Sequence, residues 1–231
     1  MSKSVLVIAA HPDDEILGCG GTVARHVEAG DSVAVAILAE GITSRDRQRD
    51  RERRSDELSR LQQAARAANA TLGVENVVLL GFPDNRMDTV ALLDIVKTIE
   101  DLIERHRPDI LYTHHGGDVN IDHRRIHDAV VTACRPAPES PQVTTLLFFE
   151  IASSTEWQTP SSAPPFAPNW YVDISATLDL KNLALEAYAS EMRPWPHARS
   201  VEAVTHLARW RGTNVGVEAA EAFVLGRRIT R

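Results

Sequence analysis

The chain has 231 residues, of which 43% are hydrophobic and 25% are charged, so it can form one sizeable α/β domain around its own core. A formal net charge of −7, without a basic stripe to offset it, argues against a nucleic-acid partner, because phosphates would be repelled. No apolar run approaches a membrane-spanning length and no charged-then-apolar leader precedes the first expected strand, so we expect a cytoplasmic protein. The two cysteines fall in expected helices and in no paired motif, so we expect them to be reduced thiols.

The N-terminal segment is the most informative stretch of the chain. An unbroken apolar run rich in β-branched residues, Ser4–Ala10, ends abruptly in His11 and three acidic residues, Asp13, Asp14 and Glu15. Such a run is typical of a buried parallel strand, and the charges at its end predict polar chemistry at the carboxyl edge of a sheet. In open α/β sheets, ligands bind at this edge where the strand order reverses.

The remaining elements alternate between strands and helices, which predicts parallel βαβ units. We therefore expect a Rossmann-like three-layer α/β fold with a mainly parallel central sheet flanked by helices. Gly30 and Pro108 are typical of positions at which helices end. The expected strands after the first are residues 32–39, 77–80, 110–113, 144–151, 171–174 and 222–229, and the expected helices are residues 14–29, 51–70, 90–106, 122–134, 179–190 and 201–210.

The spacing His11-x-x-Asp14 places an imidazole and a carboxylate in one tight strand-to-helix connection. These are two of the three protein ligands that a catalytic zinc ion needs. Asp13 lies between them and is left free, as metal-assisted hydrolysis requires of a general base. Alternatively, Asp13 or Asp14 caps the following helix, which is a common role of a lone aspartate after a strand. If one of these aspartates caps the helix, the other polar residues of the cluster remain unexplained, so we expect a metal site.

A second polar cluster follows the fourth expected strand. His123 begins the next helix, a position equivalent to that of His11, so parallel strands can bring the two imidazoles together, and His123 is the third expected ligand. Asp122 is adjacent to it, and a carboxylate that is hydrogen-bonded to a ligand imidazole fixes its tautomer. His114 and His115 are alternative candidates for the third metal ligand. They could instead be a pair of hydrogen-bonded polar residues at the end of the strand, without a ligand role.

The two clusters together are similar to the motifs of a known family. The segments Ala10-His11-Pro12-Asp13-Asp14-Glu15 and Asn120-Ile121-Asp122-His123 resemble the LmbE-like, or PIG-L, family of zinc-dependent N-deacetylases, and the resemblance extends from Lys3 to about Arg135. It implies an LmbE-like fold, substrates that contain N-acetylglucosamine, and Zn²⁺ as the cofactor, although iron or cobalt would suit the same ligands. It also implies one deacetylase domain over residues 1–231, whose C-terminal third, about 152–231, contributes a lid and parts of the substrate pocket.

Taken residue by residue, the resemblance assigns roles to several positions. Asp13 becomes the general base, and Asp122 matches a family carboxylate near the last metal ligand. Arg54 and Asp84 resemble positions that hold the sugar. The implied metal ligands are His11, Asp14 and His123.

The sequence departs from the family pattern at Asn120, where many members have a histidine that stabilises the oxyanion or protonates the leaving amine. Asn120 can donate a hydrogen bond to the oxyanion but cannot supply a proton. The proton could come instead from Asp13, acting first as base and then as acid, from His115, or from His197. His197 lies in a rigid aromatic segment, and the alternative is that this segment forms a hydrophobic lid without a catalytic role. We expect Asp13 to do so, with His197 as the next candidate.

We therefore expect a metal-dependent hydrolase that releases acetate and a free amine from an N-acetyl amino sugar or glycoconjugate. Two alternatives remain, a deacetylase of a non-sugar amide and a sugar- or nucleotide-binding module of the same fold that performs no hydrolysis. Asp13 argues against the module, because a binding protein needs no free carboxylate beside three metal ligands. Gly18, Gly20 and Gly21 do not form the phosphate-binding pattern of dinucleotide-binding proteins. Because relatives commonly self-associate, a homo-oligomer is a further expectation.

Overall fold

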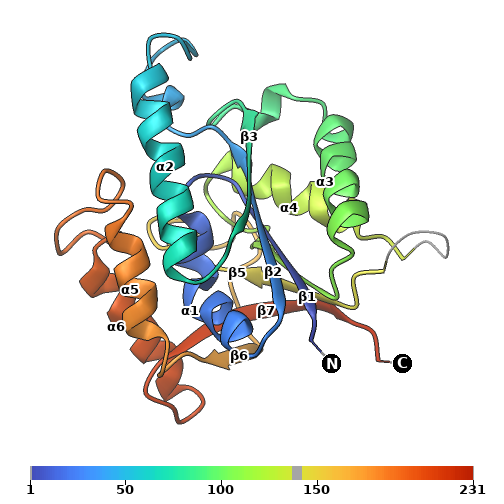
Figure 1. The fold of residues 1–231 in the computed structure, drawn as a ribbon, viewed down its shortest axis with the longest axis vertical. Helices are drawn as coiled ribbons and strands as arrows, with labels where there is room; N and C mark the ends of the chain where they lie inside the picture. Colours follow the sequence, from blue (N-terminus) through green and yellow to red (C-terminus); the bar gives the residue numbers. More distant parts are fainter. Residues whose placement is uncertain (1, 137–141, 231) are drawn as a thin grey trace.

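The centre of the molecule is one mixed β-sheet, described here from a computed structural model that covers residues 2–136 and 142–230 (Figure 1). The strands of these residues are β1 (Ser4–Ala9), β2 (Ser32–Ala39), β3 (Asn76–Phe82), β4 (Ile110–His114), β5 (Thr145–Phe149), β6 (Trp170–Asp173) and β7 (Ala220–Arg228). They lie side by side in the order β3-β2-β1-β4-β5-β7-β6. The first five strands are parallel, whereas β7 runs antiparallel to both β5 and β6.

Helices cover both faces of this sheet. The helices of the described residues are α1 (Asp14–Glu28), α2 (Ser55–Thr71), α3 (Leu92–His106), α4 (Ile121–Ala133), α5 (Leu178–Glu186) and α6 (Val201–Thr213). Figure 1 shows α1, α2, α5 and α6 on one side of the sheet and α3 and α4 on the other. None of these helices is long and apolar enough to cross a membrane.

Strand β1 is buried on both faces, which explains its unbroken apolar sequence. Alternate residues point to opposite faces of a strand. Val5, Val7 and Ala9 accordingly join the core beneath α1 and α2, and Leu6 and Ile8 join the core beneath α3 and α4. The chain leaves β1 toward β2 and β3 on one side and returns to β4 on the other, so the strand order reverses beside the carboxyl end of β1. The predicted α/β fold with a mainly parallel sheet is confirmed.

The second and fifth helices have boundaries that differ from the predicted ones. The second helix begins at Ser55 rather than at Arg51. Arg49 and Arg51 both bind the carboxylate of Glu40, at distances between 2.7 and 2.9 Å, and these ion pairs hold the preceding residues in a turn. The fifth helix ends at Glu186, and the chain then continues through turns toward the carboxyl edge of the sheet.

Helix α1 contains a break that the C-terminal part of the chain stabilises. Cys19 departs from helical geometry, with φ −150°, which frees backbone N–H groups in the middle of the helix. The Glu221 carboxylate on β7 accepts two of these, from Gly21 at 3.0 Å and from Thr22 at 2.7 Å. The ammonium of Lys181 donates to the same carboxylate at 2.6 Å, and both side chains are at most 4% exposed. This buried ion pair joins α1, α5 and β7.

We predict that Glu221→Gln lowers the free energy of unfolding by about 3 kcal/mol, because the Lys181 ammonium then remains buried without a counter-charge. Urea unfolding followed by circular dichroism measures the change. Glu202→Gln is the matched control, since this glutamate on α6 is 58% exposed and its loss should cost less than about 0.5 kcal/mol. Equal losses in the two variants would show that the buried pair does not stabilise the fold.

Candidate active site

The carboxyl ends of β1 and β4 bring the two polar clusters of the sequence together. His11 lies in the connection between β1 and α1, Asp14 is the first residue of α1, and His123 lies in the first turn of α4. The ligand atoms of these three residues all lie within 4.8 Å of one another. Asp14 and His123 are fully buried, and the His11 side chain is 12% exposed. The folded chain thus places the three predicted metal ligands close enough to share one ion.

The Asp14 carboxylate is the centre of this group. Its Oδ2 atom lies 3.2 Å from Nδ1 of His11 and 3.1 Å from Nε2 of His123. Within the part of the chain that the structure describes, the buried Asp14 Oδ1 has no hydrogen-bond partner, and the buried His123 Nε2 makes no hydrogen bond of good geometry although Asp14 Oδ2 lies 3.1 Å away. Buried polar atoms are rarely left unpaired, and two nitrogens with one carboxylate are a donor set typical of catalytic zinc. The residues therefore fit a divalent transition-metal ion.

The charges around these residues favour a cation. Burial alone would raise the pKa of Asp14, but the neighbouring imidazoles of His123 and His11 hold it well below its usual value. Burial alone would lower the pKa of His123, but the carboxylates of Asp14 and Asp118 raise it to about 9. The same carboxylates that stabilise a proton on His123 would stabilise a metal ion at this position.

A carboxylate that the sequence analysis missed orients His123. Asp118 Oδ2 lies 3.1 Å from His123 Nδ1, accepts from Thr155 Oγ1 at 2.7 Å, and its other oxygen accepts from Ser154 Oγ. Although burial opposes it, the His123 contact and these hydroxyl groups lower the pKa of Asp118 well below its usual value. Asp118 thus keeps Nε2 of His123 turned toward Asp14.

Asp122, expected to support His123, instead contacts His11. Its Oδ2 atom lies 3.0 Å from His11 Nε2, and its carboxylate accepts from the backbone N–H groups of Asn85 at 2.6 Å and Met87 at 2.9 Å. Asp84 Oδ1 lies 3.3 Å from the same His11 nitrogen. The expected pairing of Asp122 with His123 is therefore wrong, because Asp118 occupies that position. His11, Asp84 and Asp122 form a second group whose ligand atoms lie within 4.8 Å of one another.

Asp13 has an unusual backbone conformation and a distinct environment. Its φ of 115° lies in the left-handed region that residues other than glycine rarely adopt. Its side chain makes no capping hydrogen bond to α1 within the described structure, so the alternative that Asp13 caps this helix is wrong. Burial raises the pKa of Asp13 to about 8, although the Arg199 guanidinium, 3.1 Å away, opposes the rise.

Glu15 supports this strained turn from inside the protein. Its carboxylate accepts the backbone N–H of Asp13 at 3.2 Å, the Tyr188 hydroxyl at 2.6 Å and the side-chain amide of Asn69 at 2.8 Å. Glu15 is 1% exposed, so these bonds are shielded from water. The three contacts tie the turn to α2 and to the segment after α5.

A polar cavity of about 230 Å³ opens beside the metal-ligand group. His11 and Asp13 form part of its wall, and Asp84, Asn85 and Asn120 form another part. The segment after β2 contributes Gly41, Ile42, Ser44 and Arg45, and the segment between α5 and α6 contributes Glu191, Arg193 and Arg199. The C-terminal third of the chain therefore supplies part of the cavity wall as well as two strands of the sheet.

Asn120 lines the cavity but is held by two hydrogen bonds. Its Oδ1 atom caps α4 by accepting the backbone N–H of Asp122 at 2.8 Å, and its Nδ2 atom donates to Asn85 Oδ1 at 2.9 Å. One N–H of the amide remains for a ligand.

Two residues that the sequence analysis considered, Arg54 and His115, have other contacts. The Arg54 guanidinium binds Asp46 at 2.7 and 2.9 Å and Glu57 at 2.7 Å, and it does not line the described cavity. His115 Nε2 lies 3.0 Å from the carbonyl oxygen of Pro164. None of these contacts faces the metal-ligand group.

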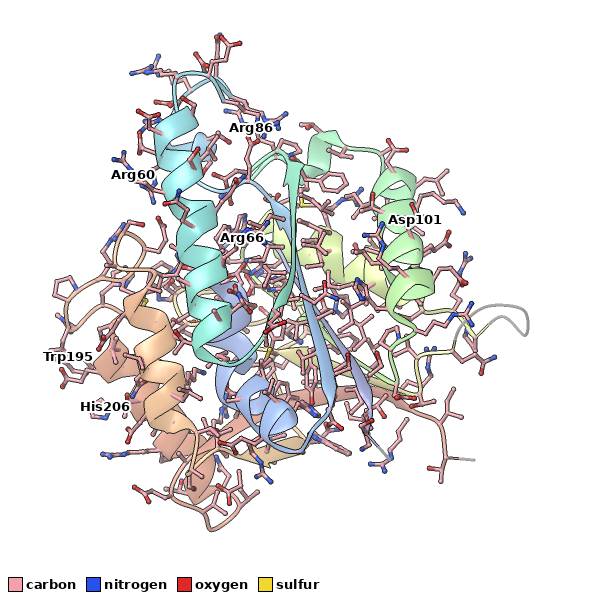
Figure 2. All side chains as sticks on the ribbon, in the orientation of Figure 1. Arg60, Arg66, Arg86, Asp101, Trp195 and His206 are labelled. Atoms are coloured by element: carbon pink, nitrogen blue, oxygen red, sulfur yellow. The ribbon has the colours of Figure 1, made fainter. Side chains whose placement is uncertain are left out.

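His197 is likewise turned away from the reacting centre. Its Nδ1 atom accepts the backbone N–H of Arg199 at 3.0 Å, and its ring packs against Trp157. It does not line the described cavity, and Trp195 of the same segment projects away from the sheet (Figure 2). The residue of this segment that reaches Asp13 is Arg199, which carried no local sequence signal.

The chain is similar in sequence to a known family and to curated relatives. Residues 6–134 match the family model described as PIG-L, GlcNAc-PI de-N-acetylase. The chain is 33% identical over 142 residues to the uncharacterized deacetylase YaiS of Escherichia coli K12, an alignment that covers 59% of this chain and 71% of YaiS. It is 25% identical over 195 residues to a probable N-acetyl-alpha-D-glucosaminyl L-malate deacetylase 2 of Bacillus cereus, which covers 83% and 84% of the two chains.

Solved structures share the fold. The N,N'-diacetylchitobiose deacetylase of Pyrococcus horikoshii superposes with a TM-score of 0.77 at 19% identity, covering 97% of this chain and 84% of the other. GalB, a 4-carboxy-2-hydroxymuconate hydratase of Pseudomonas putida, superposes with a TM-score of 0.75 at 23% identity, covering 99% and 98%. At such identities the likeness concerns the fold alone, and the site residues must decide the reaction.

We predict that Asp118→Asn weakens the affinity of the protein for Zn²⁺ by about 10- to 100-fold, because His123 loses the carboxylate that orients it. Competition with a chromophoric chelator measures this affinity. Asp128→Asn is the matched control, since Asp128 lies on the exposed face of α4 and its replacement should leave the affinity unchanged. An unchanged affinity in the Asp118 variant would show that Asp118 does not orient His123 for metal binding.

Proposed function

Because the chain belongs to the PIG-L family of GlcNAc-PI de-N-acetylases, we propose that it is a metal-dependent hydrolase that removes the acetyl group from an N-acetyl amino sugar. The observation that carries this proposal is the position of Asp13. Its carboxylate lies on the cavity wall beside His11, next to a three-residue ligand group of which it is not a member. Deacetylases of N-acetylglucosamine-type substrates among the relatives support the choice of reaction.

In this proposal His11, Asp14 and His123 hold a divalent transition metal. Zn²⁺ suits this donor set, and iron or cobalt would also be accepted. When bound, the metal would supply a Lewis acid for the amide carbonyl and a lowered pKa for the attacking water. The carboxylates of Asp118 and Asp122 keep the two imidazoles in the orientation that this requires.

Asp13 takes the proton from the attacking water in the proposed mechanism. Burial raises its pKa to about 8, near neutral pH, so its carboxylate can accept a proton and later release it. Arg199 holds the carboxylate in place and favours its charged form. The same Asp13 then protonates the leaving amine, because His115 and His197 point elsewhere.

The oxyanion and the sugar have further candidate contacts on the cavity wall. The remaining N–H of Asn120 can donate to the oxyanion, an interaction worth about 3 kcal/mol in comparable sites. Asp84, which lines the cavity, can accept a hydrogen bond from a sugar hydroxyl. Arg54 stabilises the segment after β2 through Asp46 and acts on the sugar only through that segment.

We predict that Asp13→Asn retains metal and loses about 10²- to 10⁴-fold in kcat, because an amide cannot accept the proton. Acetate release gives kcat, and elemental analysis of the purified protein gives the metal content. Asp56→Asn, at an exposed position of α2, is the matched control and should leave both unchanged. Near-normal turnover in the Asp13 variant would exclude it as the base.

The reaction class is tested by a substrate panel. We predict that the protein releases acetate from methyl N-acetylglucosaminide, that a chelator abolishes this activity, and that added Zn²⁺ restores it. His123→Ala should lose both metal and activity. Faster release from acetylated aliphatic amines than from the glycoside would favour the non-sugar amidase, and metal binding without acetate release would favour a binding module.

A further inference from the structure

A side chain, rather than the backbone ladder, joins the end of β4 to the turn after β1. The last residues that pair in the ladder are Val7 and Tyr112, although both strands continue beyond them. His114 is the final residue of β4, and its Nε2 atom accepts the backbone N–H of Ala10 at 2.8 Å. Both residues are fully buried. His114 therefore fixes the start of the turn that carries His11.

The ring of His114 also contacts the ligand on the other segment. It stacks on the imidazole of His123, with 3.9 Å between the ring centroids and 19° between the ring planes. Phe149 of β5 packs against the His114 ring at 68°, with 4.8 Å between the centroids, an edge-to-face contact that aromatic rings favour. His114 thus binds one ligand-bearing segment by a hydrogen bond and the other by ring stacking.

The hydrogen bond to Ala10 fixes the tautomer of His114. Because Nε2 accepts this N–H, the ring proton is on Nδ1, and neither nitrogen has a free lone pair for a metal ion while this bond is kept. Asp14 Oδ2 lies 3.7 Å from Nε2, beyond hydrogen-bond range. Nδ1 is buried without a hydrogen-bond partner among the described residues. The bond to Ala10 is therefore the polar contact for which this ring is suited.

The orientation of His123 needs more than one contact. Asp118 Oδ2, 3.1 Å from His123 Nδ1, determines which ring nitrogen faces Asp14, but the ring can still tilt about this contact. A second ring stacked on one face prevents the tilt, because atoms of a close-packed interior cannot overlap. Asp118 and His114 together therefore define both the direction and the plane of the His123 imidazole.

We infer that His114 is a positioning residue of the metal site, which holds the plane of His123 and the start of the His11 turn without binding the metal itself. The inference rests on the proposed metal-dependent function and deepens it by naming a residue that acts through two ligands. An imidazole suits both tasks because it combines a flat ring with a hydrogen-bond acceptor. Phenylalanine lacks the acceptor, and glutamine lacks the ring.

Variants that each keep one of the two contacts test the inference. His114→Phe keeps a ring against His123, and His114→Gln keeps an acceptor for the Ala10 N–H. We expect each to weaken the affinity for Zn²⁺ about tenfold, and His114→Ala, which lacks both contacts, to weaken it about 100-fold. Competition with a chromophoric chelator measures these affinities.

Thr113→Val is the matched control for general damage to the sheet. Thr113 is buried on the same strand, and its Oγ1 atom donates to the carbonyl oxygen of Ile8 on β1 at 2.9 Å. It is not a member of the ligand group, so its replacement should leave the affinity for Zn²⁺ nearly unchanged. A loss in this variant equal to that in His114→Gln would overturn the inference, as would unchanged affinity in both His114→Phe and His114→Gln.

NMR of the protein loaded with a magnetically active cadmium isotope separates positioning from ligation. With isotope-labelled histidines, we expect scalar coupling between the metal and the ring nitrogens of His11 and His123, and the same coupling in His114→Gln. Coupling to a third imidazole that disappears in this variant would overturn the inference, because His114 would then be a ligand.

These measurements do not depend on acetate release. If the protein binds Zn²⁺ but releases no acetate from an N-acetyl amino sugar, the proposed function fails, and the affinities of the variants still decide the inference. If the unmodified protein binds no Zn²⁺, the proposed function and the inference both fail.

Discussion

The structure depends on the burial of β1 at the centre of the sheet. Because helices cover both faces of this strand, its position and register are fixed, and so is the point at which the following turn begins. That turn emerges where the strand order reverses, between β1 and β4, and carries His11 and Asp14 to meet His123 from the neighbouring strand-to-helix connection. A rigid apolar strand thus positions polar groups whose ligand atoms lie close enough to share one ion.

The second feature of the site is the separation of Asp13 from the ligand group. A left-handed backbone turns this residue away from its neighbours, and Glu15 holds the turn by accepting the Asp13 N–H. Arg199, from the far end of the chain, holds the carboxylate itself. Conformational strain of this kind concentrates at functional sites, because the surrounding structure must stabilise it. The C-terminal third therefore takes part in the site that the N-terminal half begins.

The sequence could predict the elements whose signals are local. Three local features are sufficient to predict the sheet and the proximity of the three candidate ligands. They are the apolar run of β1, the polar cluster after it and the family motif at His123. Contacts between distant segments could not be predicted in this way. Asp118 is held beside His123 by hydrogen bonds from the distant residues Ser154 and Thr155. Arg199 contacts Asp13 although the two residues are 186 positions apart in the chain. Asp122 was expected near His123 because the two are adjacent, but residues adjacent in a helix point in different directions.

The most direct test of this account is the location of the metal in crystals soaked with zinc and acetate, determined by anomalous diffraction at the zinc edge. The account predicts one ion bonded to His11, Asp14 and His123, with the Asp13 carboxylate outside the coordination sphere and acetate in the adjoining cavity. An ion bound instead by His11, Asp84 and Asp122, or bonded directly to Asp13, would contradict it.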